Sequence, residues 1–291
     1  MASKIFLKSL LYITLITAGF FLTFFIVYPQ VSRCFFVSLS SFEKVQPSVY
    51  ISEGTTQIEK DSLLKFLQHS DSRIIDFWKE KQSNPTIIYC DNEALYKKYG
   101  SETDSPANIF GTPIGSIIVI GPMGLNTDVI SHETSHAELA ERLGWLTMEL
   151  SVPTWFNEGL ALMVDYRFSN PDMQFRYEDY KKEWYRKTGF GATEVSLRDI
   201  SSIKGFFQGE SEDVYLSYLT SGLEVSRWLK RVGRDGLLEF IGRMNEGDGF
   251  GNAYLTVQRN EMKKFRFKEP YLQTNQNKRK PNNLFELSLL K

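Results

Sequence analysis

Two histidines placed four residues apart in one predicted helix constrain the fold of this chain more than any other feature. The stretch Asp128–Leu143 follows capping residues, begins with an acid and ends before Gly144, which together predict a helix. Residues four apart lie on one face of a helix, so His132 and His136 share a face. The apolar residues on that face are Val129, Leu139 and Leu143. The spacing therefore predicts that both imidazoles point into the core.

This buried pair indicates a metal site. A buried imidazole without a partner is costly, whereas Zn²⁺ binds imidazole nitrogen at about 2.0–2.1 Å. Glu133 is turned about a quarter of a circle from the histidines, where its carboxylate can reach a water beside the metal. The opposite side of the helix carries Glu138, Glu141 and Arg142, which excludes a helix inside a membrane. A chance match to H-E-x-x-H is the alternative, so the site needs a third ligand.

The next predicted helix, Thr154–Arg167, supplies a candidate for that ligand. Trp155, Glu158 and Leu162 share a face there, and a carboxylate among apolar residues is costly unless it is paired or binds a metal. Gly159 costs about 1 kcal/mol relative to alanine in mid-helix, which makes sense if the two helices approach closely. A glutamate on the surface of the helix is the alternative for Glu158.

The two motifs together resemble a known family. The order H-E-x-x-H and then W-x-x-E-G-x-A resembles the gluzincin zinc metallopeptidases, in particular the compact peptidase MA-like domains related to the aminopeptidase and thermolysin groups. The matching residues are His132, Glu133, His136, Trp155, Glu158, Gly159 and Ala161, with Pro153 two before the tryptophan. The resemblance implies that His132, His136 and Glu158 bind one Zn²⁺ and that Glu133 is the general base. The 22 positions from His136 to Glu158 slightly exceed the aminopeptidase spacing, and an extended segment between the helices could absorb them.

The resemblance also implies a residue on a later helix that stabilises the oxyanion. No histidine follows His136, so a tyrosine must take this role. The stretch "YLSYLTSGLEVSRWLKRVG" is similar to the corresponding helix of these domains, and Tyr218 aligns with its tyrosine. Tyr215, one turn earlier, is the alternative, and a tyrosine that only packs is a further alternative for either position.

One position departs from the resemblance. Thermolysin-type sequences carry an acid one turn after the ligand glutamate, where it orients a histidine, and Leu162 occupies that position here. Another acceptor must therefore fix the imidazole. We name Asp165 as the one candidate for this acceptor, although its spacing from the histidines gives no support.

The resemblance implies an α+β fold: a zincin-like metallopeptidase domain with a small mixed sheet and a helical C-terminal part. We expect one transmembrane helix before this domain, on the separate grounds given below. It implies peptide-bond hydrolysis by a zinc-activated water with Glu133 as base. The strand Ser116–Ile120 is where such folds place an edge strand, with which a peptide or protein substrate could pair. We favour an endopeptidase, because the sequence shows no obvious acidic pocket that would bind the free amino terminus of a substrate. The alternative is a non-catalytic, membrane-anchored module with structural zinc that binds a protein partner.

A membrane anchor is predicted near the N-terminus. Ser9–Tyr28 contains no charge and, as a helix, spans about 30 Å, the thickness of the bilayer hydrocarbon. A cleaved signal peptide is the alternative. Lys4 and Lys8 precede the stretch, which favours a cytoplasmic N-terminus. We therefore expect a signal-anchored, single-pass protein whose main domain is extracytoplasmic, in a bacterial inner membrane and facing the periplasm.

The remaining composition limits the partners. The net charge of −1 argues against nucleic acid as a partner. Cys34 and Cys90 could pair in an oxidising compartment, but two unrelated thiols are favoured. His69 lies in an unrelated segment, where a surface position is favoured. We expect five regions: a cytoplasmic N-terminus at 1–8, the anchor at 9–28, a juxtamembrane stalk at 29–48, the metallopeptidase domain at 49–265 and a polar tail at 266–291.

Hydrophobic periodicity predicts the other elements. A helix is expected over residues 55–81 and strands over Thr86–Cys90 and Ser116–Ile120. A short helix and a long loop should lie between these strands. After a polar interval, helices are expected over Glu212–Val232 and Asp235–Met244, separated by Gly233.

Overall fold

The computed structural model describes residues 25–103, 105–193 and 195–268, with side chains to residue 263, and also Tyr12, Thr14, Gly19 and Thr23. Most of the predicted anchor at 9–28 and of the predicted tail at 266–291 lies outside these residues. Within the part of the chain that is described, no helix is both long and apolar enough to cross a bilayer. The transmembrane anchor and the membrane location therefore stay predictions.

The described residues form a mixed five-stranded sheet in the order β1-β2-β3-β5-β4. The central strands β2, β3 and β5 are parallel, whereas the edge strands β1 and β4 pair antiparallel with their neighbours. The strands are β1 (Glu43–Gln46), β2 (Val49–Ile51), β3 (Thr86–Tyr89), β4 (Ala107–Thr112) and β5 (Gly115–Ile120). The α+β class and the small mixed sheet are thus confirmed.

The edge strand differs from the prediction. β5, the predicted edge strand, lies inside the sheet, and β4, which was predicted as a loop, forms the edge. Asn108, Gly111 and Pro113 give this stretch the composition of a loop. Its strand conformation comes from a tight hairpin, in which Thr112 pairs with Gly115 and the ladder runs on to Ala107 and Ile120.

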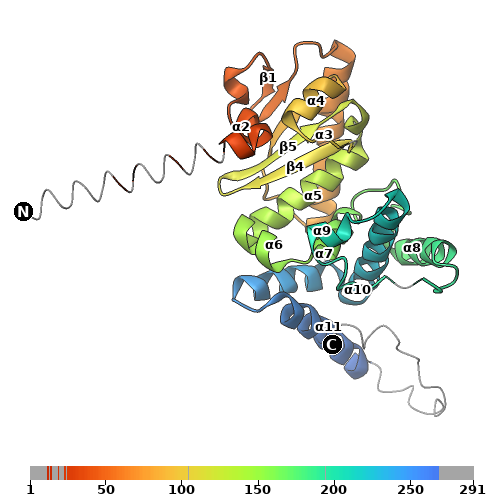
Figure 1. The fold of residues 1–291 in the computed structure, drawn as a ribbon. Coiled ribbons are helices and arrows are strands. Elements are labelled where there is room, and N and C mark those ends of the chain that lie inside the picture. Colours follow the sequence, from red (N-terminus) through yellow and green to blue (C-terminus); the bar gives the residue numbers. More distant parts are fainter. Residues whose placement is uncertain are drawn as a thin grey trace, which may run out of the picture.

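Both faces of the sheet are covered by helices (Figure 1). Alternate residues of a strand point to opposite faces, so Ile118 and Ile120 enter one core and Ile117 and Val119 enter the other. The first core contains residues of α3 (Gln57–Trp78) and α5 (Thr127–Leu143), and the second contains residues of α2 (Pro29–Phe35) and α4 (Glu93–Tyr99). β5 is therefore buried on both sides.

Residues 29–48, predicted as an irregular stalk, are folded against the sheet. They contain α2, the 3₁₀ turn η1 (Val37–Leu39) and β1. Cys34 and Val37 are buried in the second core, together with Cys90. Both cysteines are free. These elements are too short to show a hydrophobic period in the sequence, which explains why the segment was read as irregular.

The second half of the described chain is helical. α10 contains both predicted helices, with a break at Gly233, whose φ is 65°. α7 ends at Ala161, six residues before the predicted end, and the polar interval contains a helix, α8, that was not predicted. The elements are α6 (Trp145–Ser151), α7 (Thr154–Ala161), α8 (Met173–Lys187), α9 (Ile203–Phe206), α10 (Ser211–Asn245) and α11 (Phe250–Lys268).

Tight packing fixes α7 against α10. A Cβ added to Gly159 would lie 2.4 Å from Cγ2 of Val225 and 2.9 Å from the carbonyl oxygen of Ser221. The predicted close approach at Gly159 is therefore real, but the partner is α10 and not the histidine helix. The glycine sets the position of α7, and with it the position of Glu158.

The histidine helix is buried on more sides than predicted. Glu138, assigned to the polar side, is fully buried. Its carboxylate accepts hydrogen bonds from the backbone N–H groups of Gln82 and Ser83 at 2.9 Å and pairs with Arg142 at 2.8 Å. The chain after α3 covers this side of α5, which the local sequence does not reveal. α5 is thus held from both sides.

Candidate metal centre

α5 begins and ends as its capping signals predict. The Asn126 side chain accepts a hydrogen bond from the Val129 N–H at 2.9 Å, and Gly144 ends the helix with a φ of 79°. His132 and His136 are 7% and 5% exposed, and their ring centroids are 4.9 Å apart. The two imidazoles are therefore buried next to each other on one helix face.

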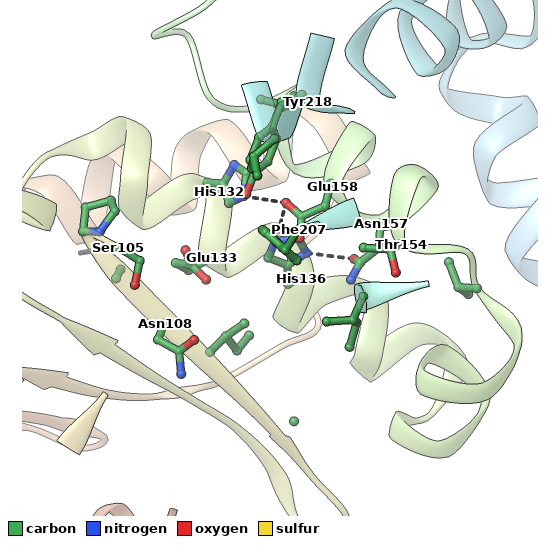
Figure 2. A pocket seen from close by; sticks show the side chains of 18 of the residues that line it. Ser105, Asn108, His132, Glu133, His136, Thr154, Asn157, Glu158, Phe207 and Tyr218 are labelled. Atoms are coloured by element: carbon green, nitrogen blue, oxygen red, sulfur yellow. Dashed lines mark hydrogen bonds and ion pairs between the residues drawn. The ribbon is translucent and has the colours of Figure 1, made fainter. Parts of the chain in front are cut away.

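Glu158 of α7 meets both imidazoles (Figure 2). Its Oε2 atom lies 3.3 Å from Nε2 of His132 and 3.7 Å from Nε2 of His136. One ligand atom from each of the three residues falls within 4.8 Å of the others. The Oε2 atom is buried and has no hydrogen-bond partner among the described residues. A buried oxygen without a partner is costly, so this group could bind a metal ion.

The outer nitrogen of each ring contacts a residue at or after α7. His136 Nδ1–H donates to Oδ1 of Asn157 at 2.8 Å, and His132 Nδ1 lies 3.4 Å from Oδ2 of Asp165. Asp165 is fully buried, and Arg167 donates to it through Nε at 2.9 Å and Nη2 at 2.6 Å. Such contacts fix ring orientation and leave each Nε2 facing Glu158.

Asp165 was a candidate from the sequence, although its spacing gave it no support. The sequence analysis missed Asn157 and Arg167. Asn157 could have been noticed as an amide directly before the candidate ligand. Arg167 carried no local signal, because its role depends on the turn that follows α7. In the structure Asn157 and Asp165 contact the histidines, and Arg167 contacts Asp165.

The charges of the group shift the pKa values of its members. Burial lowers the pKa of His132, but its close contacts with the carboxylates of Asp165 and Glu158 outweigh burial and raise the pKa to about 10. Burial acts to raise the pKa of Asp165, but the contact with His132 and the hydrogen bonds from Arg167 outweigh it and lower that pKa to about 2. Without a metal, His132 is therefore a cation beside two carboxylates at neutral pH.

We expect zinc binding at pH 7 to release about one proton from His132. A metal ligand must be a neutral imidazole, and the pKa of about 10 keeps this ring protonated in the metal-free protein. The apparent affinity for zinc should therefore fall as the pH is lowered, by about tenfold per unit. Calorimetric titration with zinc in two buffers of different ionisation enthalpy counts the protons. Heats that do not depend on the buffer would contradict the expectation.

Glu133 lies beside the metal group without belonging to it. Figure 2 shows its carboxylate between the histidine pair and Asn108 of β4. Burial raises the pKa of Glu133, and the two histidines act against this rise. A carboxylate with a raised pKa next to a metal group is suited to accept and return a proton.

The structure separates the two candidate tyrosines. Tyr218 lies over His132, with ring centroids 6.5 Å apart, and its hydroxyl interacts with Glu158. Burial, followed by the charge of Glu158, raises the pKa of Tyr218. The Tyr215 hydroxyl instead donates to Glu183 of α8 at 3.3 Å. Of the two, Tyr218 is therefore the tyrosine beside the metal group.

The metal group opens into a cavity of about 800 Å³. Strand β4 lines one side through residues 107–109 and Gly111, and α6 lines another through Met148 and Glu149. Phe207, Tyr218 and Leu219 contribute from α10 and the segment before it. The cavity is large enough for several residues of an extended chain, and it reaches Glu133 and all three members of the metal group.

Comparisons with known proteins do not assign the chain to a family. A scan against protein-family models gave no match, and a search of curated proteins gave none either. The case for a function therefore rests on the residues of the cavity and their geometry.

Proposed function

We propose that this protein is a zinc-dependent peptidase with a zincin-like domain. The observation that carries the proposal is the convergence of His132, His136 and Glu158 beside a separate carboxylate, Glu133, in one open cavity. A structural metal site needs neither an adjacent base nor access from solvent. Both features support a catalytic site.

The three ligand candidates suit zinc. Two imidazole nitrogens and one carboxylate oxygen are a common set for catalytic zinc, and the set leaves a coordination position open. When bound, the zinc ion would supply Lewis acidity at the floor of the cavity. His132 and His136 present Nε2 to this point, because Asp165 and Asn157 contact the opposite sides of the rings.

Glu133 and Tyr218 would move and stabilise charge during hydrolysis. Glu133 accepts a proton from the attacking water and then passes it to the leaving amine. Tyr218 is protonated at neutral pH, as tyrosines ordinarily are, and its raised pKa strengthens this preference, so its hydroxyl can donate to the developing oxyanion. One such donor contributes about 3–4 kcal/mol of transition-state stabilisation.

Strand β4 gives an extended substrate a place to bind. It is an edge strand, so the backbone groups on its outer side are free of ladder bonds to another strand of the described sheet. Residues 107–109 of this strand also line the cavity beside Glu133. A peptide could pair with β4 through main-chain hydrogen bonds and pass over the metal group. This role was expected for β5 and is now proposed for β4.

Metal removal and restoration test the proposal. Zinc-loaded protein should cleave members of a peptide library, a chelator should abolish the cleavage, and one zinc per chain should restore it. Glu158→Ala should lower zinc affinity by more than about a hundredfold, because loss of a partner outside the ligand set already costs about 10- to 100-fold. His69→Ala changes the exposed third histidine and should leave metal content unchanged. Failure of the zinc-loaded protein to cleave any peptide would refute the proposal.

A further inference from the structure

The segment between the two metal-binding helices forms a wall of the cavity. It contains α6, which lies between His136 and Glu158 in the sequence. Trp145 packs so closely on β4 that a Cβ added to Gly111 would lie 2.7 Å from its Cδ1 atom. Met148 on the same helix is buried. Because Trp145 and Met148 are both packed, α6 is held in place, and Glu149, the residue after Met148, is held with it.

Glu149 presents an exposed carboxylate to the cavity that it lines. Its Oε1 atom lies 3.4 Å from the position of a Cβ on Gly111, next to the edge strand. It is close enough to His136 for the two side chains to interact electrostatically. Three glutamates line the cavity, and the other two, Glu133 and Glu158, belong to the catalytic group. Among the described residues Glu149 has no hydrogen bond or ion pair, and its side chain is exposed, so its carboxylate is available to a ligand.

The surroundings of Glu149 match an aliphatic chain that ends in a cation. Met148 and Val152 line the cavity on either side of it in sequence and offer apolar contact. A lysine side chain has this composition, with an apolar stem and a charged end. The free α-amino group of a peptide presents the same charged nitrogen without the stem. A charge-assisted hydrogen bond to a carboxylate is among the stronger polar contacts in proteins.

We propose that Glu149 forms a subsite that binds a cationic nitrogen of the substrate beside strand β4. The inference rests on the proposed peptidase function, and it names the substrate class: peptides with a lysine or arginine side chain, or a free α-amino group, near the bond that is cleaved. The local sequence does not reveal this acid, because the position of Glu149 in the cavity depends on how α6 packs on β4.

Matched peptides test the subsite. Internally quenched peptides that differ only in lysine or norleucine at one position are compared with wild type and Glu149→Gln. Wild type should prefer the lysine peptide at one position by about 10- to 100-fold in kcat/KM, and the variant should lose this preference while cleaving the norleucine peptide normally. Glu141→Gln, the same change at an exposed position of α5, is the control and should behave as wild type. An unchanged preference in Glu149→Gln would overturn the proposal.

Two further experiments are needed. One distinguishes a lysine side chain from a free α-amino group as the bound cation, and the other distinguishes failure of the subsite proposal from failure of the peptidase proposal. In the first experiment, the N-terminus of each peptide is acetylated. If the subsite binds the free α-amino group, acetylation should abolish the preference. If it binds the lysine side chain, the preference should remain. Binding of the same peptides to zinc-loaded Glu133→Gln protein, with and without Glu149→Gln, is measured by calorimetry. Binding that depends on Glu149 without any cleavage by wild type would refute the peptidase and keep the subsite. Cleavage or binding without a charge preference would refute the subsite alone.

Discussion

Replacement of Glu133 by glutamine is expected to lower kcat for peptide hydrolysis by about 10²–10⁴-fold while zinc stays bound. Glutamine has the size and polarity of the carboxylate, but it cannot accept the proton of the attacking water. The ligand atoms belong to His132, His136 and Glu158, so the metal group does not need Glu133. Elemental analysis and initial rates on one preparation measure both quantities.

The control for this variant is Glu141→Gln on the same helix, which should retain full activity because Glu141 is exposed. Loss of zinc together with activity would show that Glu133 supports the metal group instead of acting as a base. Equal rates in wild type and variant would exclude a proton-transfer role. If wild type itself shows no cleavage, the non-catalytic module with structural zinc becomes the better description.

Replacement of Phe156 by alanine is expected to lower the free energy of unfolding by about 3–5 kcal/mol. The Phe156 side chain is fully buried in α7, and it contacts aromatic rings from α7, α10 and α11. The ring centroids of Phe240 and Phe250 both lie 5.1 Å away. The change removes a large apolar side chain and leaves a cavity that the packed rings cannot fill. Urea denaturation followed by tryptophan fluorescence gives the free energy.

This variant also tests how the metal group is positioned. Phe156 lies two residues before Glu158, so loss of its packing should loosen α7 and lower zinc affinity as well as stability. Phe175→Ala makes the same change at an exposed position of α8 and should alter unfolding by less than about 0.5 kcal/mol. A Phe156→Ala protein with wild-type stability would show that the aromatic cluster is not what holds α7.

The predictions that held were those that depended on local spacing. α5 begins at Thr127 and ends at Leu143, close to the expected limits, because its cap and its terminal glycine lie in the adjoining sequence. The strands β3 and β5 were found because an apolar run between turn residues is a local signal. By contrast, β4 was missed because its strand conformation depends on pairing with β5. The segment 29–48 was misread because its short elements are held by the sheet beneath them.

The sequence by itself determined that two imidazoles would project from one helix into the core, with a carboxylate about a quarter of a circle away. The reason is that the helical repeat fixes the relative directions of residues 132, 133 and 136. Only the tertiary structure decided that Glu158 meets both rings, that Asp165 and Asn157 orient them, that Tyr218 is the nearer tyrosine and that Glu149 enters the cavity. These contacts join separate elements, and their distances depend on packing at sites such as Gly159 and Trp145, which no local pattern records.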